Sequence, residues 1–355
     1  MPGDAMTPLE RLAAYDRGAA VDRLPCVPIV GNTAARVIGV KVSALRGDGA
    51  LLARAQVAAY RRFGYDNIRV FTDLYTQAEA MGALIRHPED ETAFLEAPAI
   101  PDSASIGRLR PADPLRDGDL PAHLEAARRT LAAVGKEVPV TVALTGPFTN
   151  ASFLIGTENL VRLSLRNPEA VHQLCEISLQ SSLAYADAIL ATGAVPSLTD
   201  PMSSATVIGP RQFREFSQPY LARLVAFIRR RGGAVTLHIC GRTGPVWDGM
   251  ADTGAACLSL DDQVDLAEAR RRVGHLVRLM GNVSPAAVML QGTPAQVRAA
   301  VRRVVAAAAD SPRGLVVASG CSLPTETPFA NIDAMLDAVR EIGSPRAAAG
   351  LEVLP

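Results

Sequence analysis

Cysteines, a net charge and long apolar runs are scarce or missing in this chain, and each shortage excludes a class of protein. Five cysteines among 355 residues are few and odd in number, which argues against a disulfide framework. We therefore expect reduced thiols and a cytoplasmic location. The 36 lysines and arginines are balanced by 36 aspartates and glutamates, so charge gives no reason to expect a nucleic acid or a membrane surface as a partner.

No uninterrupted apolar stretch approaches the roughly 18 to 20 residues that a membrane helix needs. The N-terminus also lacks the basic segment followed by an apolar one that marks a signal peptide. No G-x-G-x-x-G turn follows the first apolar run, which disfavours a two-domain dinucleotide-binding fold. Since no repeat, low-complexity tract or long linker divides the chain, we expect a single domain over residues 1–355.

Short runs rich in valine, isoleucine and leucine alternate with longer stretches of helical period. We expect the apolar runs to form eight strands, at 24–30, 67–71, 138–144, 195–198, 234–237, 256–260, 276–280 and 315–318. The segments of helical period are 49–63, 123–134, 159–191, 210–231, 265–273, 294–309 and 331–342. This alternation predicts parallel βαβ units, and eight such strands close a barrel. The fold class predicted is therefore α/β, a (β/α)8 TIM barrel.

One more helix is predicted before the first strand, at residues 6–15. Thr7 and Glu10 fit a capping box, and Pro8 fits the first helical position. We expect this N-terminal helical extension, residues 1–23, to cover the bottom of the barrel. The proline-rich stretch 98–121 has no clear period, which indicates an excursion over the surface or the barrel mouth.

Three potential metal ligands stand where apolar strands end. His238 and Cys240 are two residues apart, so on a strand they point to the same face, and Cys321 follows the last strand. Two thiolates and one imidazole suit Zn²⁺ and leave a fourth position open for chemistry. The alternative for a cysteine is a small buried core residue. We interpret the remaining three cysteines in that way: Cys26, Cys175 and Cys257.

Polar residues directly after barrel strands face the barrel mouth more often than not. Asp73 follows the second strand and is a candidate catalytic group, with the N-cap of the next helix as its alternative. Asp200 follows the fourth strand and could bond the second N–H of His238 or act as a base, with a turn role as its alternative. Asn282 follows the seventh strand and could bind substrate or stabilise the turn.

Other polar residues are weaker candidates for the site. Tyr75 and Asn150 could line the pocket. Arg242 could contact an anion, or could simply be solvated. The other histidines have no partner at ligand spacing, and we interpret them as surface or structural residues: His87, His123, His172 and His275.

Four segments together resemble the uroporphyrinogen decarboxylase superfamily: IRVFTDLYTQAEAMG, LTGPFTNASFLIG, LMGNVSPAAVML and SGCSLPTETPFANIDAM. The H-x-C pair and the cysteine in the G-C-S turn are similar to the zinc methyltransferase branch, which includes methylcobamide:coenzyme M methyltransferases. This resemblance implies a (β/α)8 barrel along nearly the full chain. It also implies zinc on His238, Cys240 and Cys321, and it matches Asp73 to the aspartate that decarboxylases use at the reacting substrate.

The chain departs from the decarboxylase pattern at several positions. Of the arginine-rich N-terminal loop that grips a substrate's carboxylates, only Arg36 is present. Cys321 and Phe153 stand where the decarboxylases have a histidine and a tyrosine. We therefore expect porphyrin-acid binding to be lost.

The expected function is zinc-dependent transfer of a methyl group from a methylcorrinoid to a small thiol. The donor could be methylcobalamin or a separate corrinoid protein, because the D-x-H-x-x-G signature of a corrinoid-binding domain is absent. Zinc would favour the thiolate, which is the nucleophilic form. The acceptor could be coenzyme M, homocysteine, another small thiol or a pterin. Two alternatives stay open: a decarboxylase of a smaller carboxylated substrate, and a non-catalytic corrinoid-binding partner.

Overall fold

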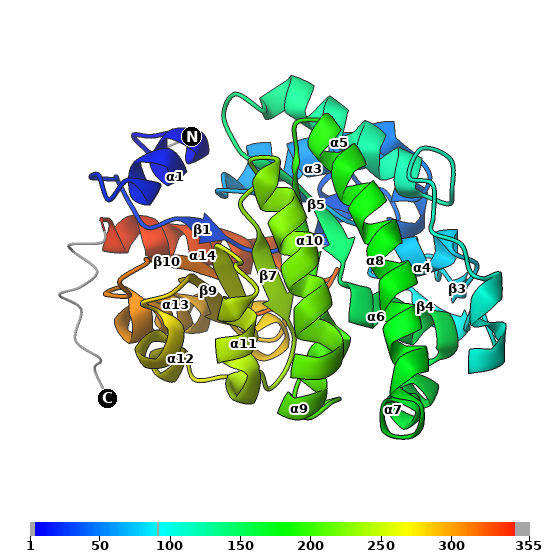
Figure 1. Cartoon of the computed structure of the whole chain (residues 1–355). Helices are drawn as coiled ribbons and strands as arrows, with labels where there is room; N and C mark the ends of the chain where they lie inside the picture. The colour runs from blue at the N-terminus through cyan, green and yellow to red at the C-terminus, as the bar shows by residue number, and fades with distance from the viewer. Residues whose placement is uncertain (1–3, 91, 345–355) are drawn as a thin grey trace.

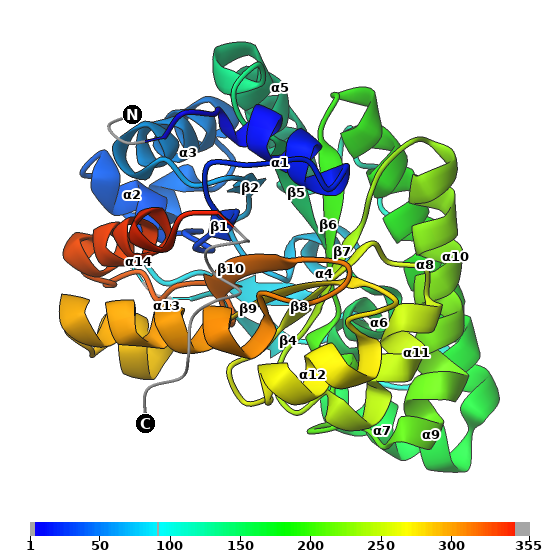
Figure 2. The same ribbon diagram turned by 90° about the vertical axis from the view of Figure 1, so that its left-hand side faces the viewer.

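The computed structural model describes residues 4–90 and 92–344. The predicted domain (1–355) and N-terminal extension (1–23) therefore include residues outside the described ranges. Within those ranges, eight parallel strands form one curved sheet that is surrounded by helices (Figures 1 and 2). The strands are β1 (Cys26–Val27), β2 (Ile68–Val70), β5 (Val140–Thr145), β6 (Val195–Thr199), β7 (Thr236–Ile239), β8 (Cys257–Leu260), β9 (Arg278–Val283) and β10 (Leu315–Ser319). Each of them overlaps one of the predicted strands.

The order of the strands around the sheet is β1-β10-β9-β8-β7-β6-β5-β2. All neighbouring pairs in this order are parallel. The two end strands come together where the backbone N–H of Asp66, just before β2, donates to the carbonyl of Cys26 in β1 at 2.9 Å. The fold is thus the predicted (β/α)8 barrel, whose strands all end at the same mouth.

Helices cover the outside of the sheet and connect its strands. They are α1 (Pro8–Asp16), α2 (Thr33–Val37), α3 (Gly49–Phe63), α4 (Thr76–Ala80), α5 (Leu120–Val134), α6 (Pro147–Ile155), α7 (Thr157–Arg166), α8 (Pro168–Ala191), α9 (Pro210–Gln212), α10 (Gln218–Arg230), α11 (Trp247–Asp252), α12 (Leu266–Val273), α13 (Pro294–Ala308) and α14 (Phe329–Ile342). Short 3₁₀ segments lie at Val42–Leu45, Ser103–Arg108, Pro201–Ser203 and Gly244–Val246, and π-helical segments at Phe213–Ser217 and Pro285–Leu290.

The helix expected over residues 159–191 is two helices, α7 and α8. Pro168 begins α8, and the side chain of Asn167 caps it by accepting from the N–H of Ala170. Proline has no N–H to donate and disfavours a helical residue before it, so the helix breaks there. The sequence does not predict α2, α6 or α11. In α6 every side chain is buried, so it lacks the polar face whose period would reveal a helix.

The N-terminal helix α1 has the predicted capping box. The side chain of Thr7 accepts from the N–H of Glu10 at 3.2 Å, and the Glu10 carboxylate accepts from the N–H of Thr7 at 2.8 Å. At the other end of α1, the Tyr15 hydroxyl donates to the carbonyl of Leu315 and accepts from its N–H. Because Leu315 begins β10, α1 lies at the bottom of the barrel, as expected (Figure 2).

Buried charges reinforce this lower end. Arg11 and Arg23 bind opposite oxygens of the Asp66 carboxylate, at 2.5 and 2.6 Å. One of these oxygens also accepts from the N–H of Cys26. Since all three charged groups are nearly inaccessible to water, removing one partner would leave an uncompensated buried charge. The network therefore fixes the start of β1 and β2.

A small antiparallel hairpin, β3 (Leu84–Arg86) with β4 (Phe94–Ala97), lies outside the barrel sheet and is not predicted by the sequence. The proline-rich stretch 98–121 follows it. The N–H of Ile100 donates to the carbonyl of Leu154 in α6, so the stretch begins along the outer helices. Helix α5 then starts at Leu120 rather than at residue 123.

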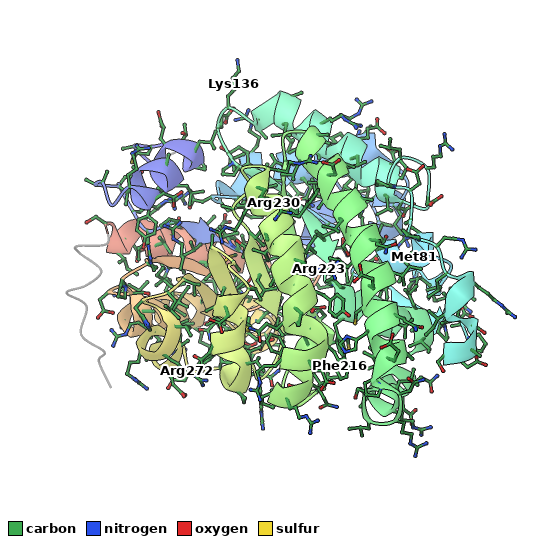
Figure 3. All side chains as sticks on the ribbon, viewed as in Figure 1. Met81, Lys136, Phe216, Arg223, Arg230 and Arg272 are labelled. Atoms are coloured by element: carbon green, nitrogen blue, oxygen red, sulfur yellow. The ribbon has the colours of Figure 1, made fainter. Side chains whose placement is uncertain are left out.

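Ion pairs connect neighbouring helices on the outer surface. Arg223 on α10 pairs with Glu176 on α8 at 2.6 Å, and Figure 3 shows Arg223 and Arg230 along α10. Exposed pairs of this kind contribute at most about 1 kcal/mol each. Among the described residues, we find no helix whose length and apolar character would allow it to span a membrane.

Candidate metal centre

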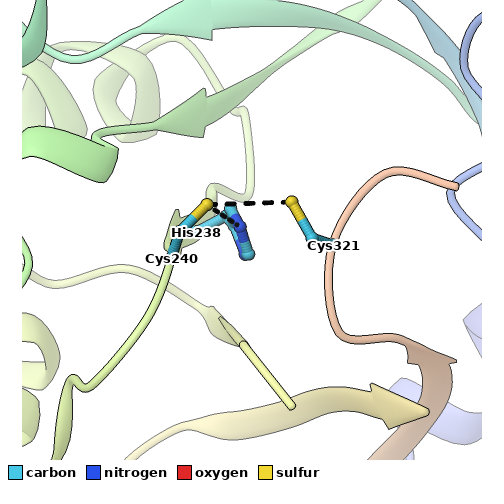
Figure 4. A group of neighbouring side chains, drawn as sticks. All are labelled: His238, Cys240 and Cys321. Atoms are coloured by element: carbon cyan, nitrogen blue, oxygen red, sulfur yellow. Dashed lines mark hydrogen bonds between the residues drawn. The ribbon is translucent and has the colours of Figure 1, made fainter. Parts of the chain in front are cut away.

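His238, Cys240 and Cys321 meet at the mouth of the barrel. His238 is in β7, Cys240 directly follows that strand, and Cys321 lies two residues beyond β10. The Nε2 atom of His238 is 3.1 Å from the Sγ of Cys240, which is 3.7 Å from the Sγ of Cys321 (Figure 4). Across residues 4–90 and 92–344, this is the one group of three or more histidine, cysteine or carboxylate donors close enough to hold a metal ion.

Glycines beside both cysteines allow their turns to pack closely. Gly241 has a φ of +73°, and a Cβ there would lie 2.7 Å from the Oγ1 of Thr206. A Cβ on Gly320 would lie 2.6 Å from the backbone nitrogen of Asp262. A larger residue at either position would displace the turn. These glycines therefore help to place Cys240 and Cys321 opposite each other.

The donor spacing fits a zinc ion. Tetrahedral zinc with ordinary Zn–S and Zn–N bonds places two sulfurs about 3.8 Å apart, and a sulfur and a nitrogen about 3.5 Å apart. The observed sulfur separation is 3.7 Å, and the nitrogen–sulfur separation is somewhat shorter, at 3.1 Å. Both cysteines are free thiols. Three donors of this kind leave a fourth position for another ligand.

The imidazole of His238 is oriented for coordination. Its Nδ1 lies 3.1 Å from both the carbonyl oxygen and the Oγ of Ser259 on β8. An N–H at Nδ1 donates to that carbonyl, which leaves the lone pair of Nε2 directed at the two cysteines. We predicted Asp200 as a possible partner of this imidazole, whereas in the structure the partner is Ser259. The signal for Ser259 was a polar residue inside an otherwise apolar, fully buried strand.

The two thiols titrate as a pair. The hydrogen bond between their sulfur atoms lowers the pKa of Cys321 and raises the pKa of Cys240, and His238 lowers the pKa of Cys321 further. One thiolate is thus favoured even before a metal ion binds. A cation that bonds to both sulfurs would displace the remaining proton.

Asp200 supports the end of β7 from the neighbouring strand. Its backbone N–H donates to the carbonyl of His238 at 2.9 Å. Its carboxylate accepts from the N–H of Thr149 at 2.8 Å, and from the hydroxyls of Ser203 and Ser217 at 2.5 and 3.0 Å. Burial raises the pKa of Asp200, while these hydrogen bonds lower it. The contacts match the turn role, and a catalytic role for Asp200 stays a prediction.

Asp73 is buried and bound on both oxygens. One oxygen accepts from the N–H of Tyr75 at 2.8 Å, and the other from Arg46 at 2.6 Å. Arg46 also binds Glu79 at 2.8 Å. The ring of Tyr75 packs against Phe153, with ring centroids 4.4 Å apart. The carboxylate of Asp73 thus fixes the turn before α4, and its predicted catalytic role is open to experiment.

Asn282 and Asn150 have structural contacts. The Nδ2 of Asn282 donates to the carbonyls of Asp261 and Val264, both at 3.0 Å, and so stabilises the turn after β8. Asn150 is buried in α6, where its Nδ2 lies 3.3 Å from the sulfur of Met81. Its Oδ1 has no hydrogen-bond partner among the described residues. Binding of substrate by either asparagine remains a prediction.

Most of the histidines and cysteines that we interpreted as structural, and Arg242, which we interpreted as solvated, can now be described by their burial and their partners. His123 is buried between Thr72 and Tyr185, and burial lowers its pKa. His87 pairs with Glu79, and Arg242 is exposed. The remaining cysteines are all buried: Cys26, Cys175 and Cys257.

Two residues near the three donors, Asp261 and Arg69, were not among the residues predicted from the sequence. Asp261 accepts from the N–H of Gly241 at 2.8 Å and so holds the turn after Cys240. The sequence feature that could have identified Asp261 is the one that identified Asp200, namely a carboxylate directly after a strand. Arg69 lies within β2 and points into the barrel, and its signal was a charge in the middle of an apolar run.

Comparisons with known proteins agree with this geometry. The family model for uroporphyrinogen decarboxylase (URO-D) matches residues 7–342. The methylcobamide:CoM methyltransferase MtaA of Methanosarcina barkeri is 29% identical over 337 residues, covering 92% of this chain and 96% of its own length. A uroporphyrinogen decarboxylase of Nitrosococcus oceani is 31% identical and covers 80% of each chain. A solved methyltransferase structure from Methanosarcina mazei superposes with a TM-score of 0.86 at 27% identity, over 95% of this chain and 99% of the other. The chain belongs to the uroporphyrinogen decarboxylase family.

Proposed function

We propose that this protein transfers a methyl group from a methylcorrinoid to a small thiol, with zinc held by His238, Cys240 and Cys321. Its likeness to methyltransferases along nearly the whole chain makes it a methyltransferase of this family. The proposal concerns the metal, the donor and the acceptor. The observation that carries it is the spacing of the three donors, which suits zinc with one position left free.

Zinc at this site would supply Lewis acidity that favours the thiolate form of an acceptor at neutral pH. The protein's own contribution is to keep the donors in place. Ser259 orients the ring of His238, and Asp200 anchors the backbone of the same residue. We retain Asp73 and Asp200 as proposed acid–base residues, and Asn282, Asn150 and Tyr75 as proposed contacts of the substrate or the corrinoid.

Decarboxylation of a smaller carboxylated substrate is the alternative, because some relatives are named decarboxylases. The position of Arg36 speaks against it. Its guanidinium donates to the carbonyls of Thr325 and Thr327, at 3.0 and 3.1 Å. The single arginine of the N-terminal stretch therefore binds the protein's own backbone rather than being free for a substrate carboxylate.

The test is a methyl-transfer screen with the purified, zinc-loaded enzyme. Methylcobalamin is paired with 2-mercaptoethanesulfonate, homocysteine, 2-mercaptoethanol and, as a non-thiol, tetrahydrofolate. We expect loss of the methylcobalamin absorbance and formation of a methyl thioether, detected by mass spectrometry, with at least one thiol. Binding of cobalamin without turnover would instead indicate the non-catalytic corrinoid-binding partner.

The catalytic prediction for Asp73 is tested by Asp73→Asn. Loss of a charge that acts in the reaction is expected to lower kcat roughly 10²-fold while zinc content is unchanged. Asparagine can still accept from the N–H of Tyr75, but it cannot neutralise Arg46. If Asp73 only holds this turn, thermal unfolding will occur at a lower temperature and kcat will be unchanged. Steady-state kinetics and a melting curve on the same preparation separate the two roles.

A further inference from the structure

A buried chain of hydrogen bonds ends at the carboxylate of Asp73. The Oγ1 of Thr72 lies 3.0 Å from the Nε2 of His123 and donates to the Oδ2 of Asp73 at 3.4 Å. The other ring nitrogen of His123, Nδ1, lies 3.3 Å from the hydroxyl of Tyr185. All four side chains are at most 7% exposed. The chain thus connects α8 and α5 to the end of β2, at the barrel mouth.

The imidazole of His123 is unusual for its place in the fold. His123 is the one ionisable residue among the buried residues of α5, which are otherwise alanine, leucine, valine and threonine. A buried imidazole costs free energy unless its nitrogens find partners, whereas an apolar residue would fill this position without that requirement. Burial lowers the pKa of His123, and the nearby charge of Asp73 opposes this shift. The ring is therefore neutral at pH 7.

The chain has one direction in which a proton is donated to Asp73. A neutral imidazole has one donor and one acceptor, and a hydroxyl has one proton to donate. If the Thr72 hydroxyl donates to Asp73, it must accept from the Nε2 of His123. Nε2 then carries the ring proton, and Nδ1 accepts from the Tyr185 hydroxyl. In the opposite direction, the Thr72 proton would go to Nε2 and be lost to Asp73.

The Thr72 hydroxyl is one of four donors that hold the carboxylate of Asp73. The N–H of Tyr75 and the hydroxyl of Thr76 bind Oδ1 at 2.8 and 3.3 Å, and Arg46 binds Oδ2 at 2.6 Å. Thr72 is the second donor to Oδ2, and its hydroxyl can turn away because Nε2 of the imidazole is an alternative partner. The state of the imidazole therefore decides whether Oδ2 has one donor or two.

We propose that His123 is a positioning residue for Asp73. Its Nε2–H directs the Thr72 hydroxyl at the carboxylate, and the hydroxyl of Tyr185 keeps the ring proton on Nε2. This inference rests on the proposed function and on the predicted role of Asp73 in it. A carboxylate that loses a donor is less firmly oriented, and an electrostatic contact with charge that develops in the transition state requires a fixed orientation.

The first experiment combines His123→Leu and Thr72→Val, each alone and together with Asp73→Asn, in the zinc-loaded enzyme. Each single change is expected to lower kcat roughly 10-fold, with zinc content and both KM values unchanged. Neither should lower kcat further in the Asp73→Asn background, because no carboxylate is left to orient. A further loss of the same size in that background would show that His123 acts on the fold as a whole, and would overturn the proposal.

Two amide variants test the position of the donor and do not depend on His123→Leu folding well. Glutamine is one methylene longer than asparagine, so its amide nitrogen reaches the position of Nε2, whereas that of asparagine reaches only the position of Nδ1. We expect His123→Gln to keep kcat within about threefold of the wild type, and His123→Asn to lose as much as His123→Leu. Equal kcat values in the two amide variants would contradict the proposal.

His172→Leu is the matched control. His172 is a second half-buried histidine bonded to a tyrosine, with its Nδ1 2.9 Å from the hydroxyl of Tyr220, and its ring packs on Phe216 rather than on the chain to Asp73. This variant should keep the wild-type kcat. Melting curves recorded for every variant separate a loss of stability from a loss of turnover.

Nuclear magnetic resonance of protein labelled with ¹⁵N-histidine tests the chain without any methyl transfer. We expect the ring of His123, identified by the signal that is missing in His123→Gln, to be the neutral Nε2–H tautomer at pH 7. An Nδ1–H tautomer or an imidazolium would overturn the proposal. If no thiol is methylated, the proposed function fails, and the Nε2–H tautomer still supports the chain. If transfer occurs but Asp73→Asn keeps the wild-type kcat, the proposed function stands and this inference fails.

Discussion

Replacing any one of the three donors, in His238→Ala, Cys240→Ser or Cys321→Ser, is expected to reduce bound zinc far below one per chain and to abolish methyl transfer. Each residue supplies one of only three protein bonds to the metal, so the loss should exceed the 10- to 100-fold effect typical of an outer-shell change. The barrel should stay folded, because β7 and β10 are each paired with neighbours on both sides. Elemental analysis, a transfer assay and circular dichroism measure the three quantities.

Cys175→Ser is the matched control for loss of a thiol. Cys175 is buried in α8, and its sulfur donates to the carbonyl of Phe216, a bond that a hydroxyl can also make. This variant should keep full zinc occupancy and full activity. If all three donor variants also retained full zinc, the metal centre would have to lie elsewhere.

The strand count could be predicted because buried parallel strands have a simple signature. Strands covered on both faces appear as short apolar runs, and β10, from Leu315 to Ser319, is buried at every position. The hairpin β3–β4 has the opposite character. Leu84 and Phe94 are exposed there, and strands of three and four residues are too short for their alternation to be recognised in the sequence. Helix α6 could not be predicted for another reason. All of its side chains are buried, so it has no polar face whose helical period could be recognised in the sequence.

The metal centre could be predicted in part from strand ends. Parallel barrel strands all end at one mouth, so His238 and Cys321 could be placed on the same side although 83 positions separate their numbers. The hydrogen bonds around these two residues could not be predicted in this way. Whether Ser259 or Asp200 would bond the imidazole depends on which neighbouring strand turns its side chain inward. Arg69 in β2 donates from its Nη2 to the Oγ1 of Thr199 in β6 at 2.6 Å, and this contact depends on the same alternation across β5 and β6.

Addition of a competent thiol to the zinc enzyme is expected to raise the number of sulfur neighbours of zinc from two to three, and to release about one proton per site. A free thiol, with a pKa of about 8.5, is mostly protonated at pH 7, whereas metal coordination selects the thiolate. X-ray absorption at the zinc edge counts the sulfurs, and calorimetry in buffers of different ionisation enthalpy counts the proton.

The release of a proton on binding also determines the direction in which pH changes the affinity for the acceptor. Because binding releases a proton, acceptor affinity should weaken about tenfold for each pH unit below the thiol pKa, as long as the Cys240–Cys321 pair stays bound to the metal. A competent acceptor that reacts with two sulfurs still on zinc and no proton released would show that zinc does not activate a thiol. The acceptor would then be a non-thiol such as a pterin, or the metal would have a structural role.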